Sequence, residues 1–151
     1  MVLSALVDIA STFLAGLLAG EEFTIFYGVR TPLASLDAIP QLKLRQALIH
    51  RLKIMVPAIF VPTLIFGVLS TLAVTTGLVF ALHCAGLLGL FAWAIVTLPG
   101  TARINSTIAE WDPNAPPGNW KESVKAWERF ASVRPWGAII AFVMFLIAVA
   151  I

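Results

Sequence analysis

The sequence predicts an all-α fold, a polytopic membrane four-helix bundle with a short amphipathic interfacial helix before the last span. Of the 151 residues, 60% are apolar and only 12% are charged, whereas an ordinary soluble domain has about 25% charged residues. The charges are also clustered, since residues 54–102 contain no Asp, Glu, Lys or Arg. This composition excludes a typical soluble enzyme, a disordered chain and a nucleic-acid binder with a basic face. The length suits one domain over 1–151.

Four apolar segments are predicted to span the membrane, at about 3–26, 54–75, 78–99 and 135–151. As one helix, the uncharged run of 54–102 would be about 74 Å long at ~1.5 Å per residue, more than twice the ~30 Å of a bilayer core. It is therefore divided into two spans, with a turn at Thr75-Thr76-Gly77. The first segment carries only Asp8 before Gly20, and the last segment carries no charge.

The polar segments between the spans form two predicted loops, at about 28–53 and 100–134. All ten basic residues lie in these two loops, and none lies near the termini or in the turn. By the positive-inside rule, both loops are expected on the cytoplasmic side and both termini outside. The expected location is a bacterial inner membrane.

The second loop contains the predicted interfacial helix. Asn119 resembles an N-cap, and an apolar stripe of Trp120, Val124, Trp127 and Ala131 follows it between charged residues. Tryptophans with basic neighbours are typical of a helix that lies in the membrane interface. The same pattern equally suits a lid packed over the cytoplasmic end of the bundle.

Polar residues within the spans are candidates for function. Asp8 and Glu22 project from one face of the first span, which is expected to face the bundle interior. Asp8 and His83 lie at similar depths below the outer surface and are predicted to pair. The pair is either a functional site or a structural hydrogen bond between helices.

A group of charged residues is expected at the inner membrane face, where the first span ends and both loops begin. The arrangement suits a site for an anionic or phenolic group, and it also suits a belt of salt bridges that holds the helix ends together. The expected members are Glu21, Glu22, Arg30, Arg45, His50, Arg51, Arg103, Asn105 and Arg134.

The sequence offers few ligands for a metal or a cofactor. Its histidines are His50 and His83, its single cysteine is Cys84, and no histidine pair has the spacing of a helical metal site. It contains neither a phosphate-binding glycine loop nor a nucleophile elbow. No metal and no cofactor is predicted, and no nucleic acid is expected as a partner.

Two blocks of the sequence carry a resemblance to a known family. One is Arg103-Ile-Asn105…Ile108-Ala-Glu-Trp111-Asp-Pro, followed by Trp120…Trp127-Glu-Arg-Phe130…Arg134 and a last span. The other is Gly20-Glu-Glu-Phe with Leu44-Arg-Gln-Ala-Leu-Ile-His-Arg51. Over nearly its whole length the chain resembles the small membrane proteins related to anthrone oxygenases, and the second block is similar to bacterial members.

The resemblance implies an oxidation of anthrones to anthraquinones without a recognised cofactor, an activity credited to a fungal subset of that family. It assigns Asn105, Trp127 and Arg134 to the motif positions. The chain has Arg103 where the family often has proline, and Ala131 where it often has a histidine four residues after the tryptophan.

The first functional hypothesis is a cofactor-independent oxygenase that acts on an apolar phenolic or anthrone-like substrate. Glu22, or in second place Glu21, is the expected base. Further roles are expected for other members of the group: charge stabilisation by Arg45, Arg51 and Arg134, substrate orientation by Asn105, and an apolar wall from Trp127.

The second hypothesis is a non-catalytic membrane protein that binds a lipid or an apolar metabolite, or that stabilises a membrane assembly. In this case the glutamates and arginines are structural. The expected partners are the lipid bilayer, a small apolar or phenolic ligand, and a second copy of the chain in a homo-oligomer.

Overall fold

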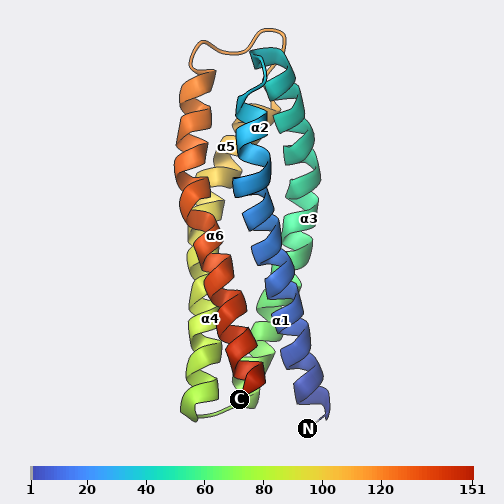
Figure 1. The fold of residues 1–151 in the computed structure, drawn as a ribbon, viewed down its shortest axis with the longest axis vertical. Helices are drawn as coiled ribbons and strands as arrows, with labels where there is room; N and C mark the ends of the chain where they lie inside the picture. Colours follow the sequence, from blue (N-terminus) through green and yellow to red (C-terminus); the bar gives the residue numbers. More distant parts are fainter. Residues whose placement is uncertain (1) are drawn as a thin grey trace.

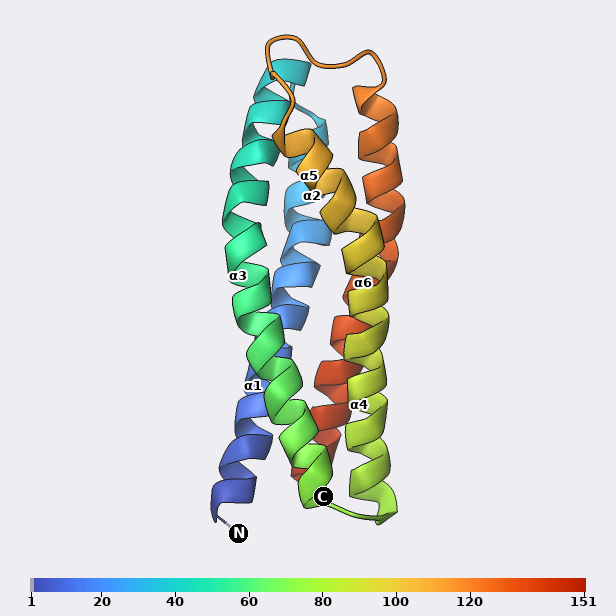
Figure 2. The same cartoon turned by 180° about the vertical axis from the view of Figure 1, so that it is seen from behind.

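A computed structural model describes residues 2–151, and in this range every regular element is helical. Four stretches are long and apolar enough to cross a membrane, and they lie side by side as columns (Figures 1 and 2). This confirms the predicted four-helix membrane bundle. The columns are Val2–Ala34, Ala38–Ala73, Gly77–Ala109 and Trp120–Ala150.

Two of the columns combine several helices. The first consists of α1 (Val2–Phe23), the π-helix η1 (Thr24–Val29) and α2 (Arg30–Ala34). The third consists of α4 (Gly77–Val96), the π-helix η2 (Thr97–Ala102) and α5 (Arg103–Ala109). The second column is α3 (Ala38–Ala73) and the fourth is α6 (Trp120–Ala150).

The two ends of the bundle differ. Both termini and the α3–α4 turn lie at one end, called here the terminal end, and the connections at 35–37 and 110–119 lie at the other, the loop end (Figure 1). Gly77 begins α4 with φ at +92°, a backbone conformation that side-chain-bearing residues rarely adopt. The chain therefore reverses direction sharply between α3 and α4.

Much of the chain expected as loop is helical instead. α3 begins at Ala38 and continues without interruption through Pro57 and Pro62, although Figure 2 shows it changing direction in its middle. The sequence placed the span only after Lys53, because charged residues mark where a helix leaves the apolar core and not where it ends. Leu42 and Ile49 are buried on one side of this extension, so the bundle stabilises it.

The separate interfacial helix expected before the last span is also not separate, since residues 120–134 continue into it as one helix through Pro135. The reason lies in the spacing of eight of its ten buried residues, which alternates between three and four positions and so keeps one seam against the bundle, with Pro135 and Gly137 buried beside it. The seam consists of Val124, Trp127, Ala131, Arg134, Ala138, Ala141, Phe145 and Ala148.

The tightest packing lies between α4 and α6. A Cβ on Gly89 would lie 2.7 Å from the Gly137 carbonyl oxygen, and a Cβ on Gly137 would lie 2.8 Å from the Gly89 carbonyl oxygen. Glycine is therefore required at both positions for the two backbones to approach. Gly86 leaves room in the same interface for the fully buried ring of Phe145.

Candidate functional site

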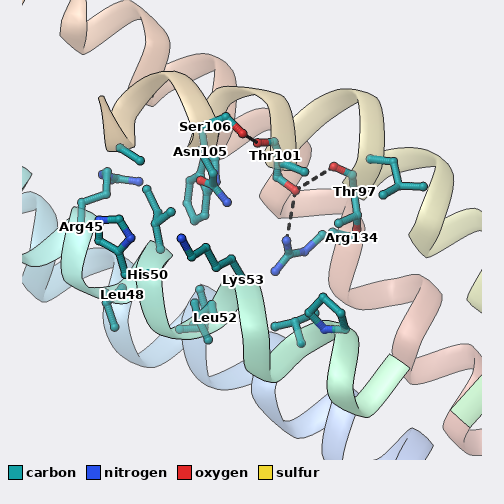
Figure 3. Close-up of a pocket in the computed structure, with 18 of the residues that line it drawn as sticks. Arg45, Leu48, His50, Leu52, Lys53, Thr97, Thr101, Asn105, Ser106 and Arg134 are labelled. Atoms are coloured by element: carbon teal, nitrogen blue, oxygen red, sulfur yellow. Dashed lines mark hydrogen bonds between the residues drawn. The ribbon is translucent and has the colours of Figure 1, made fainter. Parts of the chain in front are cut away.

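A cavity of about 700 Å³ occupies the loop end of the bundle. Its walls come from α3 on one side and from η2 and α5 on the other (Figure 3), and residues of η1, α2, α4 and α6 complete the lining. Two of its walls are π-helical, and π-helical turns are frequent at functional sites. The volume falls within the range of about 300–1,000 Å³ typical of small-molecule pockets.

The part of the cavity nearest the bundle centre is apolar and aromatic. Phe60 of α3 stacks on Trp93 of α4, with ring centroids 4.6 Å apart. Val56 and Leu52 of α3 and Leu98 of η2 extend this lining. An apolar molecule would therefore be well accommodated here.

The part nearest the loop end is basic. Arg45 is only 4% exposed, its guanidinium lies 4.9 Å from the centroid of the Trp127 ring, and its buried Nε has no hydrogen-bond partner among residues 2–151. Figure 3 shows His50 and Lys53 from the same helix and Asn105 from α5 around the same space. A cation buried without an anion is costly, so this region is ready to accept a negative group.

Glu22 lies beside the cavity but does not line it. Its Oε2 accepts a hydrogen bond of 2.8 Å from Arg134 Nε, and its Oε1 accepts one of 2.7 Å from Trp93 Nε1. Arg134 also donates to Thr101 Oγ1 at 3.1 Å (Figure 3). The Glu22 carboxylate is 2% exposed and both its oxygens are occupied, so the group is arranged as a structural ion pair.

Two further candidate residues, Glu21 and Arg51, do not line the cavity. Glu21 lies in a smaller recess between α1 and α3, beside Gly16 and Gly20, where its carboxylate makes no hydrogen bond of 3.5 Å or less in residues 2–151, although the charges of Glu22 and Arg134 act on it. Arg51 is exposed and is not among the cavity residues. The structure thus brings Arg45, Asn105, Trp127 and Arg134 to one cavity and leaves Glu21, Glu22 and Arg51 outside it.

Both interpretations of the charged group have a counterpart in the structure. The Glu22–Arg134 pair and a 4.0 Å contact between Arg30 and Glu128 both join the first column to the fourth, which is a part of what a belt of salt bridges would do. Arg45 forms no ion pair with any other described residue, and it lines the cavity.

Asp8 and His83 meet near the terminal end. His83 Nε2 lies 3.9 Å from Asp8 Oδ1, and the His83 ring is buried against Phe145 with centroids 6.0 Å apart. The hydroxyls of Ser11 and Thr12 donate to the Asp8 backbone carbonyl, not to its carboxylate. The pair therefore links α1 to α4 far from the cavity.

Three residues of the site were missed from the sequence. The side-chain amide of Gln46 donates to the carbonyls of Ile108 and Trp111 at 2.9 and 2.8 Å, so α3 holds the end of α5. Trp93 and Thr101 complete the Glu22–Arg134 network. A tryptophan deep in an apolar span was a usable signal, because a buried indole N–H usually finds an acceptor; Gln46 and Thr101 gave none.

Comparisons of the chain with protein-family models, with curated proteins and with solved structures found no match. Within residues 2–151, no group of three or more His, Cys, Asp or Glu side chains is placed to hold a metal ion.

Proposed function

We propose that the protein is a membrane protein that binds an apolar molecule with an anionic or phenolic head in the cavity at its loop end. The observation that carries this proposal is Arg45, a buried guanidinium without an ion-pair partner in residues 2–151 that faces a cavity of about 700 Å³. The head would lie against Arg45, and the apolar part would lie against Phe60 and Trp93.

The loop end is proposed to face the cytoplasm of a bacterial cell. All ten basic residues lie in the segments at or next to this end, and the positive-inside rule supports that orientation. A ligand would then be bound close to the inner membrane surface. The homo-oligomer expected from the sequence stays a prediction.

Binding is tested with two probe molecules that have the same hydrocarbon tail and differ in the charge of the head. The protein is reconstituted in phosphatidylcholine nanodiscs, and oleate and oleyl alcohol are titrated against the fluorescence of the cavity tryptophans. Oleate is expected to bind more tightly than the alcohol. Arg45→Gln is expected to weaken oleate binding about tenfold or more, since a hydrogen bond to a charged group contributes about 1.5–3 kcal/mol.

Arg51→Gln is the matched control, because Arg51 lies on the same helix but outside the cavity. It is expected to leave oleate affinity unchanged. Equal losses in the two variants would show that surface charge, and not the cavity, attracts the acid.

An anthrone oxygenase is the second candidate, because the three residues that the resemblance assigns, Asn105, Trp127 and Arg134, all line this cavity. A base would take a proton from the anthrone methylene, and the carbanion would reduce O2 to a peroxide that loses water to give the quinone. His50 and Glu110 both line the cavity, and we assign the role to His50, because histidine is the common acid–base group of proteins near neutral pH.

Catalysis is tested by O2 uptake with 1,8-dihydroxyanthrone. An oxygenase with this base would lose uptake in His50→Gln and keep it in a folded Glu22→Gln variant. Loss of uptake in Glu22→Gln alone would favour the base assigned from the sequence. Uptake equal to that of empty nanodiscs would leave binding as the function.

A further inference from the structure

Within the proposed binding function, on which this inference rests, we propose that the ligand is a single-chain lipid with a phosphate monoester head held between Arg45 and Lys53. The proposal concerns the charge of the head and the path of the chain. Both follow from which cavity residues already have partners.

Four cations line the cavity, and two of them are already neutralised. Arg134 is paired with Glu22 at 2.8 Å, and Arg30 contacts Glu128 at 4.0 Å. The charge of Glu128 also acts on Arg45, but the two side chains do not form an ion pair of 4.0 Å or less. Arg45 and Lys53 have no ion-pair partner of their own in residues 2–151.

The lining contains one carboxylate, Glu110, near the end of α5, and its side chain is exposed. It does not form an ion pair of 4.0 Å or less with any described residue. The cavity therefore presents two cations, the buried Arg45 and the exposed Lys53, that form no ion pair in residues 2–151, together with the amide of Asn105 and the ring of His50 (Figure 3).

A phosphate monoester matches this arrangement better than a carboxylate or a phenolate. It carries a charge of about −1.5 to −2 at pH 7 and has three strong acceptor oxygens. A guanidinium can donate two parallel hydrogen bonds to a phosphate, and an ammonium adds a compact charge. A monoanion would leave one of Arg45 and Lys53 without a counter-charge.

The apolar residues that line the cavity indicate the path of the lipid's hydrocarbon chain. It runs from the basic region toward the middle of the bundle along Val56, Pro57 and Phe60, and it reaches Val61 and Leu98. Val61 is 49% exposed and Leu98 is 69% exposed, so the cavity ends at residues that face the bilayer. A lipid chain can lie between α3 and η2 with its end among the surrounding lipids.

The experiment compares two lipids that have the same hydrocarbon chain and different head groups. 1-Oleoyl lysophosphatidic acid and oleate are titrated against the protein in phosphatidylcholine nanodiscs. The phosphate is expected to bind at least about tenfold more tightly, and each tenfold corresponds to about 1.4 kcal/mol. Lys53→Met, a change at an exposed position, is expected to remove this preference by weakening the binding of the phosphate at least about tenfold more than that of oleate. Lys43→Met, on the exposed side of the same helix and outside the cavity, is the matched control.

The outcomes separate this inference from the proposed function. Equal affinity for the two acids, with both above oleyl alcohol, would overturn the phosphate head and retain the binding function. No preference for either acid over oleyl alcohol would overturn both. Displacement of the lysolipid by millimolar inorganic phosphate would overturn the lipid and assign the cations to free phosphate. Failure of Lys43→Met to bind like the unmodified protein would overturn the assignment to Lys53.

Discussion

The side chains of Glu22 and Arg134 come from opposite ends of the sequence and form one buried ion pair. The Glu22 carboxylate is 2% exposed and the Arg134 side chain 7% exposed, so neither charge has water to replace its partner. Removing one partner from a buried pair is far more costly than removing both, because the remaining charge stays uncompensated.

Arg134→Gln is therefore expected to lower the free energy of unfolding by about 3–5 kcal/mol. The double variant Glu22→Gln with Arg134→Gln is expected to lose less than the sum of the single changes, because two amides can hydrogen-bond to each other. Unfolding in mixed micelles with increasing SDS measures both. Additive losses would contradict a direct coupling between the two side chains.

Trp93 contributes to the same network through its indole N–H. Trp93→Phe removes the 2.7 Å hydrogen bond to Glu22 and retains an aromatic ring against Phe60. The expected loss is about 1.5–3 kcal/mol, the usual contribution of a hydrogen bond to a charged group. Trp136→Phe serves as the control, since Trp136 is 58% exposed on the bundle surface and should leave the unfolding free energy nearly unchanged.

For single residues, the sequence predicted which face of a helix is buried better than it predicted which side chains contact each other. Glu22 is buried on the face of α1 that also carries Thr12 and Ala19. Asp8 Oδ1 lies 3.9 Å from His83 Nε2. The partners of Glu22 depend on how the columns are aligned along their length relative to one another. The spacing of residues within one helix does not give this alignment. For this reason a carboxylate interpreted as a base is, in the structure, a member of an ion pair.

Between elements, the α4–α6 contact is the one most sensitive to volume. Gly89→Ala would place a methyl group 2.7 Å from the Gly137 carbonyl oxygen, and a backbone atom cannot turn away as a side chain can. We expect a loss of about 1–3 kcal/mol in the free energy of unfolding, the usual cost of overpacking.

Gly20→Ala is the matched control, because a Cβ there meets no atom within 4 Å. It is expected to raise the unfolding free energy by about 0.5–1 kcal/mol, since alanine loses less entropy than glycine in a helix. A loss for Gly20→Ala as large as that for Gly89→Ala would refute the steric explanation.

The link between α3 and α5 is a second interaction at the scale of elements. Gln46→Glu keeps the size of the side chain but removes the two hydrogen bonds to the carbonyls of Ile108 and Trp111. Hydrogen–deuterium exchange of the segment 107–115 is expected to accelerate more in Gln46→Glu than in Gln46→Leu. The carboxylate of glutamate would be repelled by the two carbonyl oxygens, whereas leucine would neither donate a hydrogen bond to them nor repel them. Unchanged exchange in both variants would mean that the connection is held by other contacts.

The number and order of the long helices could be predicted from the charge distribution, but their lengths could not. Charged residues such as Lys43 and Arg51 led to the prediction of a loop before residue 54. In the structure they lie on the exposed side of the continuous helix α3. The cavity was not predictable either. It forms where η2 and α5 stand apart from α3, and that separation depends on packing between residues distant in the sequence.

For the whole molecule, the orientation in the membrane is open to a direct test. In a Cys84→Ser background, single cysteines are placed at Val2, Ile151 and Asn114. We expect a membrane-impermeant maleimide to label the first two in intact spheroplasts, and Asn114→Cys only after lysis, because the basic residues gather toward the loop end. Labelling of Asn114→Cys in intact spheroplasts would reverse the orientation.

The closest helix contact and the cavity lie at different heights in the same bundle. Asn105 stands about 24 Å along its column from Gly89, at ~1.5 Å per helical residue. A rotation of ~5° of α4 about the paired glycines would displace α5 by about 2 Å, the rise of little more than one residue. The hydrogen bonds from Gln46 of α3 to two backbone carbonyls near the end of α5, and from Arg134 of α6 to Thr101, oppose that displacement on both sides of Asn105. The width of the cavity is therefore set by these few polar contacts, and weakening them would alter the space for a ligand without touching the core between α4 and α6.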